Sequence, residues 1–270
     1  MSCVIMAVTS NRCFAGAWTS QEGKLYEKLS LNNYTTDRYF DNDGKKSNLS
    51  YNGKFSDINI SNYLEYGLTD SIGVINSIFV KRIENKTDFA TTTTSGIGDI
   101  EIGLKHKLAE GSYGVLSHQA TVKIPGFYDK KSALPLGNGQ FDAEYRILYG
   151  LSLWRIFPGY ANFEAGYRYR AEAPSDEFRY LAEIGGDITS KLYVRAKLDG
   201  IQSVNNSDKM SDSVGNPTTI YQFDLGKLDT ALGYKIGEMW GAELGYTPTL
   251  YGKNTADGTT FSLGVTYSIR

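Results

Sequence analysis

The sequence contains little cysteine and no long hydrophobic run. Its two cysteines, Cys3 and Cys13, both lie within residues 1–15 of a chain of 270 residues. A disulfide framework or a cysteine-ligated zinc site is therefore excluded for the rest of the chain, and a chain without thiols suits an oxidising compartment. No run of about 18 consecutive apolar residues occurs, which excludes a transmembrane helix.

An excess of charge of either sign is also absent. Lysine and arginine total 28 and aspartate and glutamate total 30, which gives a formal net charge of −2. The sequence therefore offers no basic patch for nucleic acid, and we predict no nucleic-acid partner. Hydrophobic residues make up 41 %, a value that suits a soluble protein. A transmembrane barrel has a similar composition, because its apolar residues alternate with polar ones.

Residues 1–15 differ from the rest of the chain. They contain a short apolar stretch and end in Ala15 before Gly16, which resembles the tail of a secretory signal. The basic region that usually opens such a signal is missing. We predict that residues 1–15 are a truncated or atypical signal segment and that residues 16–270 form one barrel domain. The alternative is a buried N-terminal strand.

Strict alternation of apolar and polar residues marks residues 140–170. Between 141 and 151 the odd positions are apolar or tyrosine, whereas the even positions include Asp142, Glu144 and Arg146. A period of two predicts extended strands with one apolar and one polar face. The arms are about 9–11 residues long and carry tyrosines, as expected of strands that cross a bilayer. A soluble sandwich with its charged face in water is the alternative.

The same alternation continues along the chain and predicts about twelve strands. They are expected at residues 25–34 (extending towards Phe40), 55–66, 72–82, 100–108, 114–124, 141–151, 161–170, 178–184, 192–199, 220–235, 240–250 and 261–269. Asp41 to Gly44 predicts a hairpin tip, and residues 83–95, 127–139 and 204–218 are expected to be polar loops. Tight turns alternate with mostly longer loops, as in bacterial outer-membrane barrels.

We therefore predict an all-β protein, a single antiparallel transmembrane β-barrel in the cell outer membrane. Its N-terminus is expected on the periplasmic side, and outer-membrane lipid is its expected surrounding. The last residues resemble the C-terminal insertion signal of such barrels: a polar residue, Gly264 two positions on, and then Tyr267 and Ile269 at alternate positions. Ile269 replaces the usual phenylalanine, and Arg270 follows it. The pattern predicts the barrel assembly machinery as a partner.

Four short motifs carry a family resemblance. They are Gly16-Ala17-Trp18-Thr19 with Glu22-Gly23-Lys24, Tyr39 to Gly44, Leu64 to Asp70, and Gly96 to Lys105. Together they resemble the bacterial outer-membrane barrels grouped under the MetA-pathway of phenol degradation and XagA-like names. The resemblance implies an outer-membrane location and, by its name, passage of small aromatic compounds.

The charged face of the strands is the best functional candidate. A charged side chain facing lipid costs about 2–4 kcal/mol near the bilayer midplane, so the charged face of each strand should point into the barrel. The candidates that would line the lumen are Glu144, Arg146, Glu164, Arg168, Arg170, Arg179, Glu183, Arg195, Lys197 and Asp199. They would form either a mildly cationic pore that favours anionic solutes or a closed network of ion pairs that fills the barrel.

Other chemistries find little support in the sequence. His106 and His118 could face each other, but two imidazoles without a carboxylate make a poor metal site. Ser117 and His118 are neighbours on a strand, so they point to opposite faces and cannot form a nucleophile–base pair. We predict no catalysis, metal or cofactor. The expected function is a channel or facilitator for small solutes, with aromatic and anionic solutes as candidates; the alternative is a non-conducting structural or surface-interaction barrel.

Overall fold

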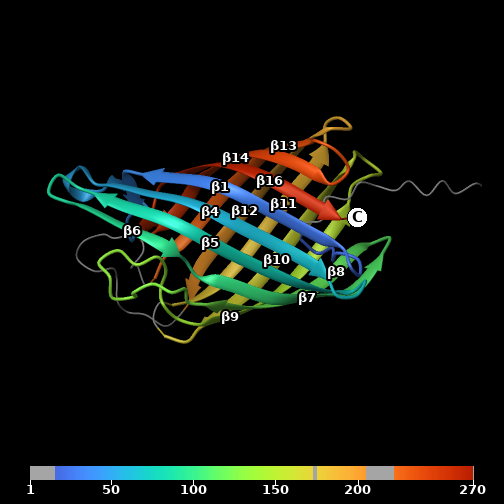
Figure 1. The fold of residues 1–270 in the computed structure, drawn as a ribbon, viewed down its shortest axis with the longest axis horizontal. Helices are drawn as coiled ribbons and strands as arrows, with labels where there is room; N and C mark the ends of the chain where they lie inside the picture. Colours follow the sequence, from blue (N-terminus) through green and yellow to red (C-terminus); the bar gives the residue numbers. More distant parts are fainter. Residues whose placement is uncertain (1–15, 173–174, 205–221, 270) are drawn as a thin grey trace, which may run out of the picture.

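The alternating segments form the strands of a closed barrel (Figure 1). The computed structural model describes residues 16–172, 175–204 and 222–269. Within them, 12 antiparallel strands close one barrel. These are β1 (Leu25–Thr36), β4 (Lys54–Gly67), β5 (Ile72–Lys86), β6 (Thr91–Ile97) with β7 (Ile100–Gly111), β8 (Gly114–Ile124), β9 (Asp142–Ser152), β10 (Gly159–Arg170), β11 (Asp176–Asp187), β12 (Leu192–Val204), β13 (Asp224–Lys235), β14 (Trp240–Lys253) and β16 (Thr259–Ile269). No helix in this part of the chain is long and apolar enough to cross a membrane.

Closure depends on the two ends of the chain. The first strand, β1, pairs with the last strand, β16, and also with β4, which in turn pairs with β5. Strands β6 and β7 both pair with β5 and act as one barrel strand that is interrupted at Gly98 and Asp99. The backbone N–H of Gly98 donates to the carbonyl of Phe79 at 2.8 Å, so the interruption stays attached to β5.

Apolar side chains cover the outside of the barrel. Leu31 of β1 lies opposite Ile60 of β4 and Leu263 of β16, and these three side chains are 51 %, 49 % and 54 % exposed. Leu104 and Phe163 are similarly exposed on other strands. Such a belt is stable only in contact with lipid, because monomers in water rarely expose so large an apolar surface. The predicted transmembrane barrel and its outer-membrane location are confirmed.

The two ends of the barrel differ. Short turns at residues 68–71, 112–113, 153–158, 188–191 and 236–239 share one end with the start of β1 and the end of β16. By the usual asymmetry of outer-membrane barrels this is the periplasmic end. The opposite end carries mostly longer connections and a small sheet of β2 (Arg38–Phe40), β3 (Lys46–Asn48) and β15 (Thr255–Ala256). Gly44, at φ 75°, forms the predicted hairpin tip between β2 and β3.

One predicted loop was wrong in part. Residues 83–95 were expected to form a loop, but β5 continues to Lys86 and β6 begins at Thr91, which leaves only residues 87–90 as a turn. The threonines are β-branched and suit a strand, and Ile83 is 1 % exposed against the barrel interior. The predicted signal segment lies outside the described residues, as does the predicted loop from residue 205 onward.

Candidate channel interior

The predicted lumen-lining residues all lie at the inward-facing positions of strands β9 to β12. In the β9–β10 pair, Glu144 lies opposite Arg168, and Arg146 lies opposite Gly166. In the β11–β12 pair, Glu183 lies opposite Lys197. The strands alternate strictly, so the inward side chains of neighbouring strands meet across the sheet. Whether these residues line a path for solute stays a prediction.

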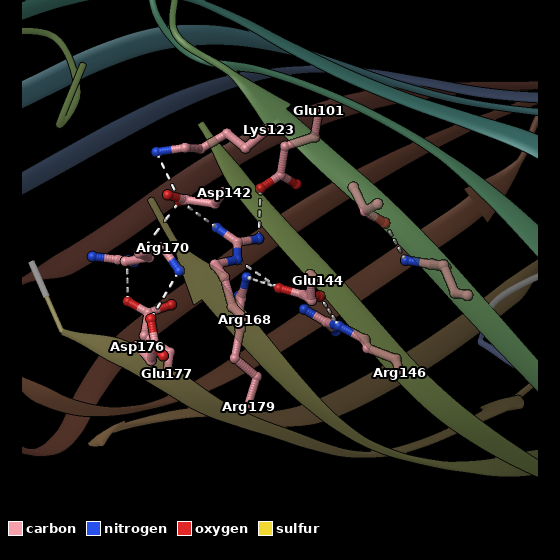
Figure 2. A network of polar contacts seen from close by, with 12 residues as sticks. Glu101, Lys123, Asp142, Glu144, Arg146, Arg168, Arg170, Asp176, Glu177 and Arg179 are labelled. Carbon is pink, nitrogen blue, oxygen red and sulfur yellow. Dashed lines mark hydrogen bonds and ion pairs between the residues drawn. The ribbon is translucent and has the colours of Figure 1, made fainter. Parts of the chain in front are cut away.

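Glu144 is the centre of the largest network of ion pairs (Figure 2). One of its oxygens accepts from Nε of Arg168 at 2.6 Å and from Nη1 of Arg179 at 3.2 Å, and the other contacts Arg146. Arg146 also donates to Glu164 at 2.8 Å through Nη1. Three guanidinium groups therefore share one carboxylate. Such charge-assisted contacts fix side chains firmly, because each loses much of its hydration inside the barrel.

A second group lies towards the long-loop end. Lys123 contacts Asp142 at 2.8 Å, and Arg170 contacts Glu177. The backbone N–H of Arg170 also donates to Asp176 at 2.8 Å. Figure 2 shows this group next to Arg168 and Glu144 on the same inner wall. The two groups form one continuous charged surface.

A third group occupies β12 to β14. Nη1 of Arg195 lies 3.4 Å from Glu183 and 3.1 Å from Asp229, and Nζ of Lys197 lies 3.1 Å from Asp229. Glu243 of β14 contacts Lys28 of β1. Among the predicted lumen residues, only Asp199 has a side chain that makes no hydrogen bond or ion pair with a described residue. The expected surplus of positive charge is therefore largely paired.

Sequence reasoning missed an ion pair on the opposite wall. Nζ of Lys105 on β7 lies 2.7 Å from Glu65 on β4, and both side chains are almost fully buried. Both residues belong to the inward parity of their strands. Applying the alternation rule to every strand, and not only to residues 141–199, would have found them.

The segment that precedes β1 occupies the short-turn end of the barrel interior. The N–H of Ala17 donates to Asn162 at 2.9 Å, the carbonyl of Trp18 accepts from Lys105 at 3.3 Å, and the N–H of Ser20 donates to Glu65 at 3.2 Å. Ala17 is completely buried. The segment therefore narrows this end of the interior, which no sequence signal predicted.

The ring of Trp18 fills space that the barrel wall leaves for it. It packs edge-on against Tyr160 with ring centroids 6.0 Å apart. A Cβ added to Gly150 would lie 2.7 Å from the indole. Glycine at this position therefore permits the close approach of the ring to the wall.

The long-loop end is narrowed by residues 125–141. Residues 127–139 of this loop were predicted to be polar, but Leu134 and Leu136 are buried against Phe55 and Ile83 of the wall. Tyr128 of the same loop donates to Asp99 and accepts from the N–H of Gly139 at 2.8 Å. Burial and the contact with Asp99 raise the pKa of Tyr128 well above the usual tyrosine value. The loop thus folds back into the barrel mouth.

Hollow space remains between the two ends. One cavity of about 360 Å³ is bordered by Lys105, Arg146, Glu164 and Lys197. A second cavity of about 220 Å³ is bordered by side chains that include Lys28, Asp229 and Glu243. Tyr63 borders both. The charged wall therefore does not fill the part of the barrel that the structure describes.

The residues considered for catalysis or metal binding lie on opposite faces of the barrel wall. His106 and His118 are cross-strand neighbours on the outer face, with Nδ1 and Nε2 3.1 Å apart. Ser117 points inward and donates to the carbonyl of Ala17. In the described ranges no group of three or more histidine, cysteine, aspartate or glutamate residues could hold a metal ion.

Comparisons with known proteins find similarity in structure alone. No protein-family model matches the sequence, and no curated protein matches it. The fold is similar to that of the COG4313 outer membrane channel from Pseudomonas putida F1, with a TM-score of 0.76 and 14 % identity over 94 % of this chain and 98 % of that chain.

Two further solved structures are more distant. The NanC porin has a TM-score of 0.52 and 8 % identity, with 89 % of this chain and 100 % of that chain covered. The CymD monoaromatic hydrocarbon channel has a TM-score of 0.50 and 10 % identity, with 93 % and 90 % covered. At such low identity the similarity concerns the fold, and the resemblance to the phenol-degradation and XagA-like barrels stays a prediction.

Proposed function

We propose that this barrel is an outer-membrane channel for small solutes. The observation that carries the proposal is the hollow interior, with cavities of about 360 and 220 Å³ between charged walls. A polar lumen lets hydrophilic solutes exchange their water shell for side-chain contacts. The fold supports the same function, since the three solved structures reported above are channels or porins.

The solutes we propose are small and either anionic or aromatic. The inner wall pairs most of its arginines with carboxylates, so preference for anions should be modest and local. An aromatic vestibule at the short-turn end, bordered by Trp18, Trp154 and Tyr160, offers ring faces to a planar solute. Both candidate classes therefore have matching chemistry in the interior.

Planar-bilayer conductance of the refolded protein tests the proposal. We expect discrete conductance steps, and we expect Arg146→Glu and Arg168→Glu to shift the reversal potential towards cation selectivity. Arg155→Glu, in the exposed turn between β9 and β10, is the matched control and should leave selectivity unchanged. Absence of steps from a correctly folded barrel would contradict the channel.

A non-conducting barrel is the second candidate function. It is favoured by the narrowing at both ends, where the segment around Trp18 and the cluster around Leu134 enter the interior. In that case the loops at the long-loop end would be the functional surface. A folded protein that never conducts, even without the Trp18 ring, would support this alternative.

Partners in assembly remain part of the proposal. Gly264, Tyr267 and Ile269 lie on β16, which closes the barrel against β1. Tyr267 faces outward and packs against Trp240, with ring centroids 4.6 Å apart. We propose that the barrel assembly machinery recognises this terminal strand before closure, when its edge is still unpaired.

A further inference from the structure

Lys227 is a cation of the inner wall that sequence reasoning missed. It lies on β13 opposite Asp199 of β12, two residues from Asp229, which pairs with Lys197. A register shift in the β13–β14 pairing falls between Gly226 and Lys227, and such bulges re-aim side chains. The side chain of Lys227 makes no hydrogen bond and no ion pair with a described residue.

Three other strands place cations near Lys227. Within its electrostatic reach are Arg179 of β11, Lys197 of β12 and Lys81 of β5, with Asp199 as the acidic neighbour. Lys81 and Lys197 are already paired, with Asp57 at 2.9 Å and Asp229 at 3.1 Å. Lys227 is therefore the lysine of this group whose side chain has no ion-pair partner among the described residues.

The guanidinium of Arg179 has an N–H donor without a hydrogen-bond partner among the described residues. Its only ion pair within the described residues is the contact of Nη1 with Glu144 at 3.2 Å, and Glu144 is shared with Arg146 and Arg168. Nε of Arg179 is buried and has no hydrogen-bond partner there. Nε and Nη2 form one edge of the guanidinium, and this edge matches the two oxygens of a carboxylate.

From these contacts we propose that Arg179 and Lys227 form a binding site for small carboxylates inside the barrel. The Nε–Nη2 edge of Arg179 takes both oxygens of the solute, and Lys227 supplies a second positive charge. The bound carboxylate gives Lys227 an ion-pair partner and gives Nε of Arg179 the hydrogen-bond acceptor that the described residues do not supply. The site rests on the proposed channel function and gives it a class of solute.

Isothermal titration calorimetry of the refolded barrel in detergent tests the site with benzoate as probe. Benzamide has the same ring without the charge and serves as the comparison probe. We expect benzoate to bind and benzamide not to bind. Lys227→Met and Arg179→Lys should each weaken benzoate binding about tenfold or more, since each removes a charge-assisted contact. Arg179→Lys keeps the positive charge and removes only the Nε–Nη2 edge that would bind both carboxylate oxygens.

Lys191→Met is the matched control, because Lys191 lies in the exposed turn between β11 and β12 and should leave binding unchanged. No benzoate binding, equal binding of benzamide, or unchanged binding in Lys227→Met would overturn the site. Bilayer conductance of the same preparations separates the two proposals. A wild-type protein that conducts but does not bind benzoate refutes the site alone, whereas one that binds benzoate but never conducts refutes the channel alone.

Discussion

A single buried carboxylate, Glu65, holds together two features of the interior. It pairs with Lys105, and it accepts from the backbone of the segment before β1 at Ser20. We expect Glu65→Gln to reduce the free energy of unfolding by about 3–5 kcal/mol, because it leaves the charge of Lys105 buried without its partner. Urea titration in lipid vesicles, followed by tryptophan fluorescence, measures the change.

A double variant tests the cause at the same scale. Glu65→Gln with Lys105→Met removes both charges and should recover much of the lost stability. Glu110→Gln is the matched control, since Glu110 pairs with Lys107 near the exposed turn after β7 and should cost at most about 1 kcal/mol. If Glu65→Gln costs no more than Glu110→Gln, the pair does not stabilise the barrel.

The segment before β1 narrows the short-turn end of the barrel interior. Trp18 lies at the short-turn end against Tyr160, and its neighbour Ala17 is completely buried. We expect Trp18→Ala to raise single-channel conductance roughly twofold, because it widens the narrow end of a polar pore. Phe261→Ala is the control, since that ring packs against Tyr246 on the outer surface, with ring centroids 5.2 Å apart. Equal conductance in wild type and Trp18→Ala would show that this segment does not restrict the path.

The strands could be predicted from the sequence, whereas this segment could not. Alternation of apolar and polar residues determines which face of a strand meets lipid, so β8 appears with the expected bounds. Gly16 to Ser20 has no period, and its position depends on side chains from β4, β7 and β10. The same reason explains why Leu134 and Leu136 were not recognised as buried in a loop that is otherwise polar.

The sequence predicts which residues face the barrel interior, but it does not predict which of them form ion pairs with one another. Alternation placed Glu144, Arg146 and Arg168 on one face of their strands, and the structure brings them together. The partners Lys123 and Asp229 come from other strands, so strand order and register had to be known first. The same holds for Lys227, whose charged neighbours Arg179, Lys197 and Lys81 come from three other strands.

The whole molecule is stable only because its apolar outer belt is in contact with lipid. A charged residue placed in this belt should therefore reduce the free energy of unfolding. Leu31 lies at mid-strand on β1 between Ile60 and Leu263 and is 51 % exposed. Leu31→Arg should reduce the free energy of unfolding in lipid vesicles by about 2–4 kcal/mol, the cost of a cation near the midplane. Ile156→Arg is the control, because Ile156 is 82 % exposed in the turn between β9 and β10. Since that turn lies outside the hydrocarbon, the control should change stability little; equal losses in the two variants would mean that the belt around Leu31 does not face lipid.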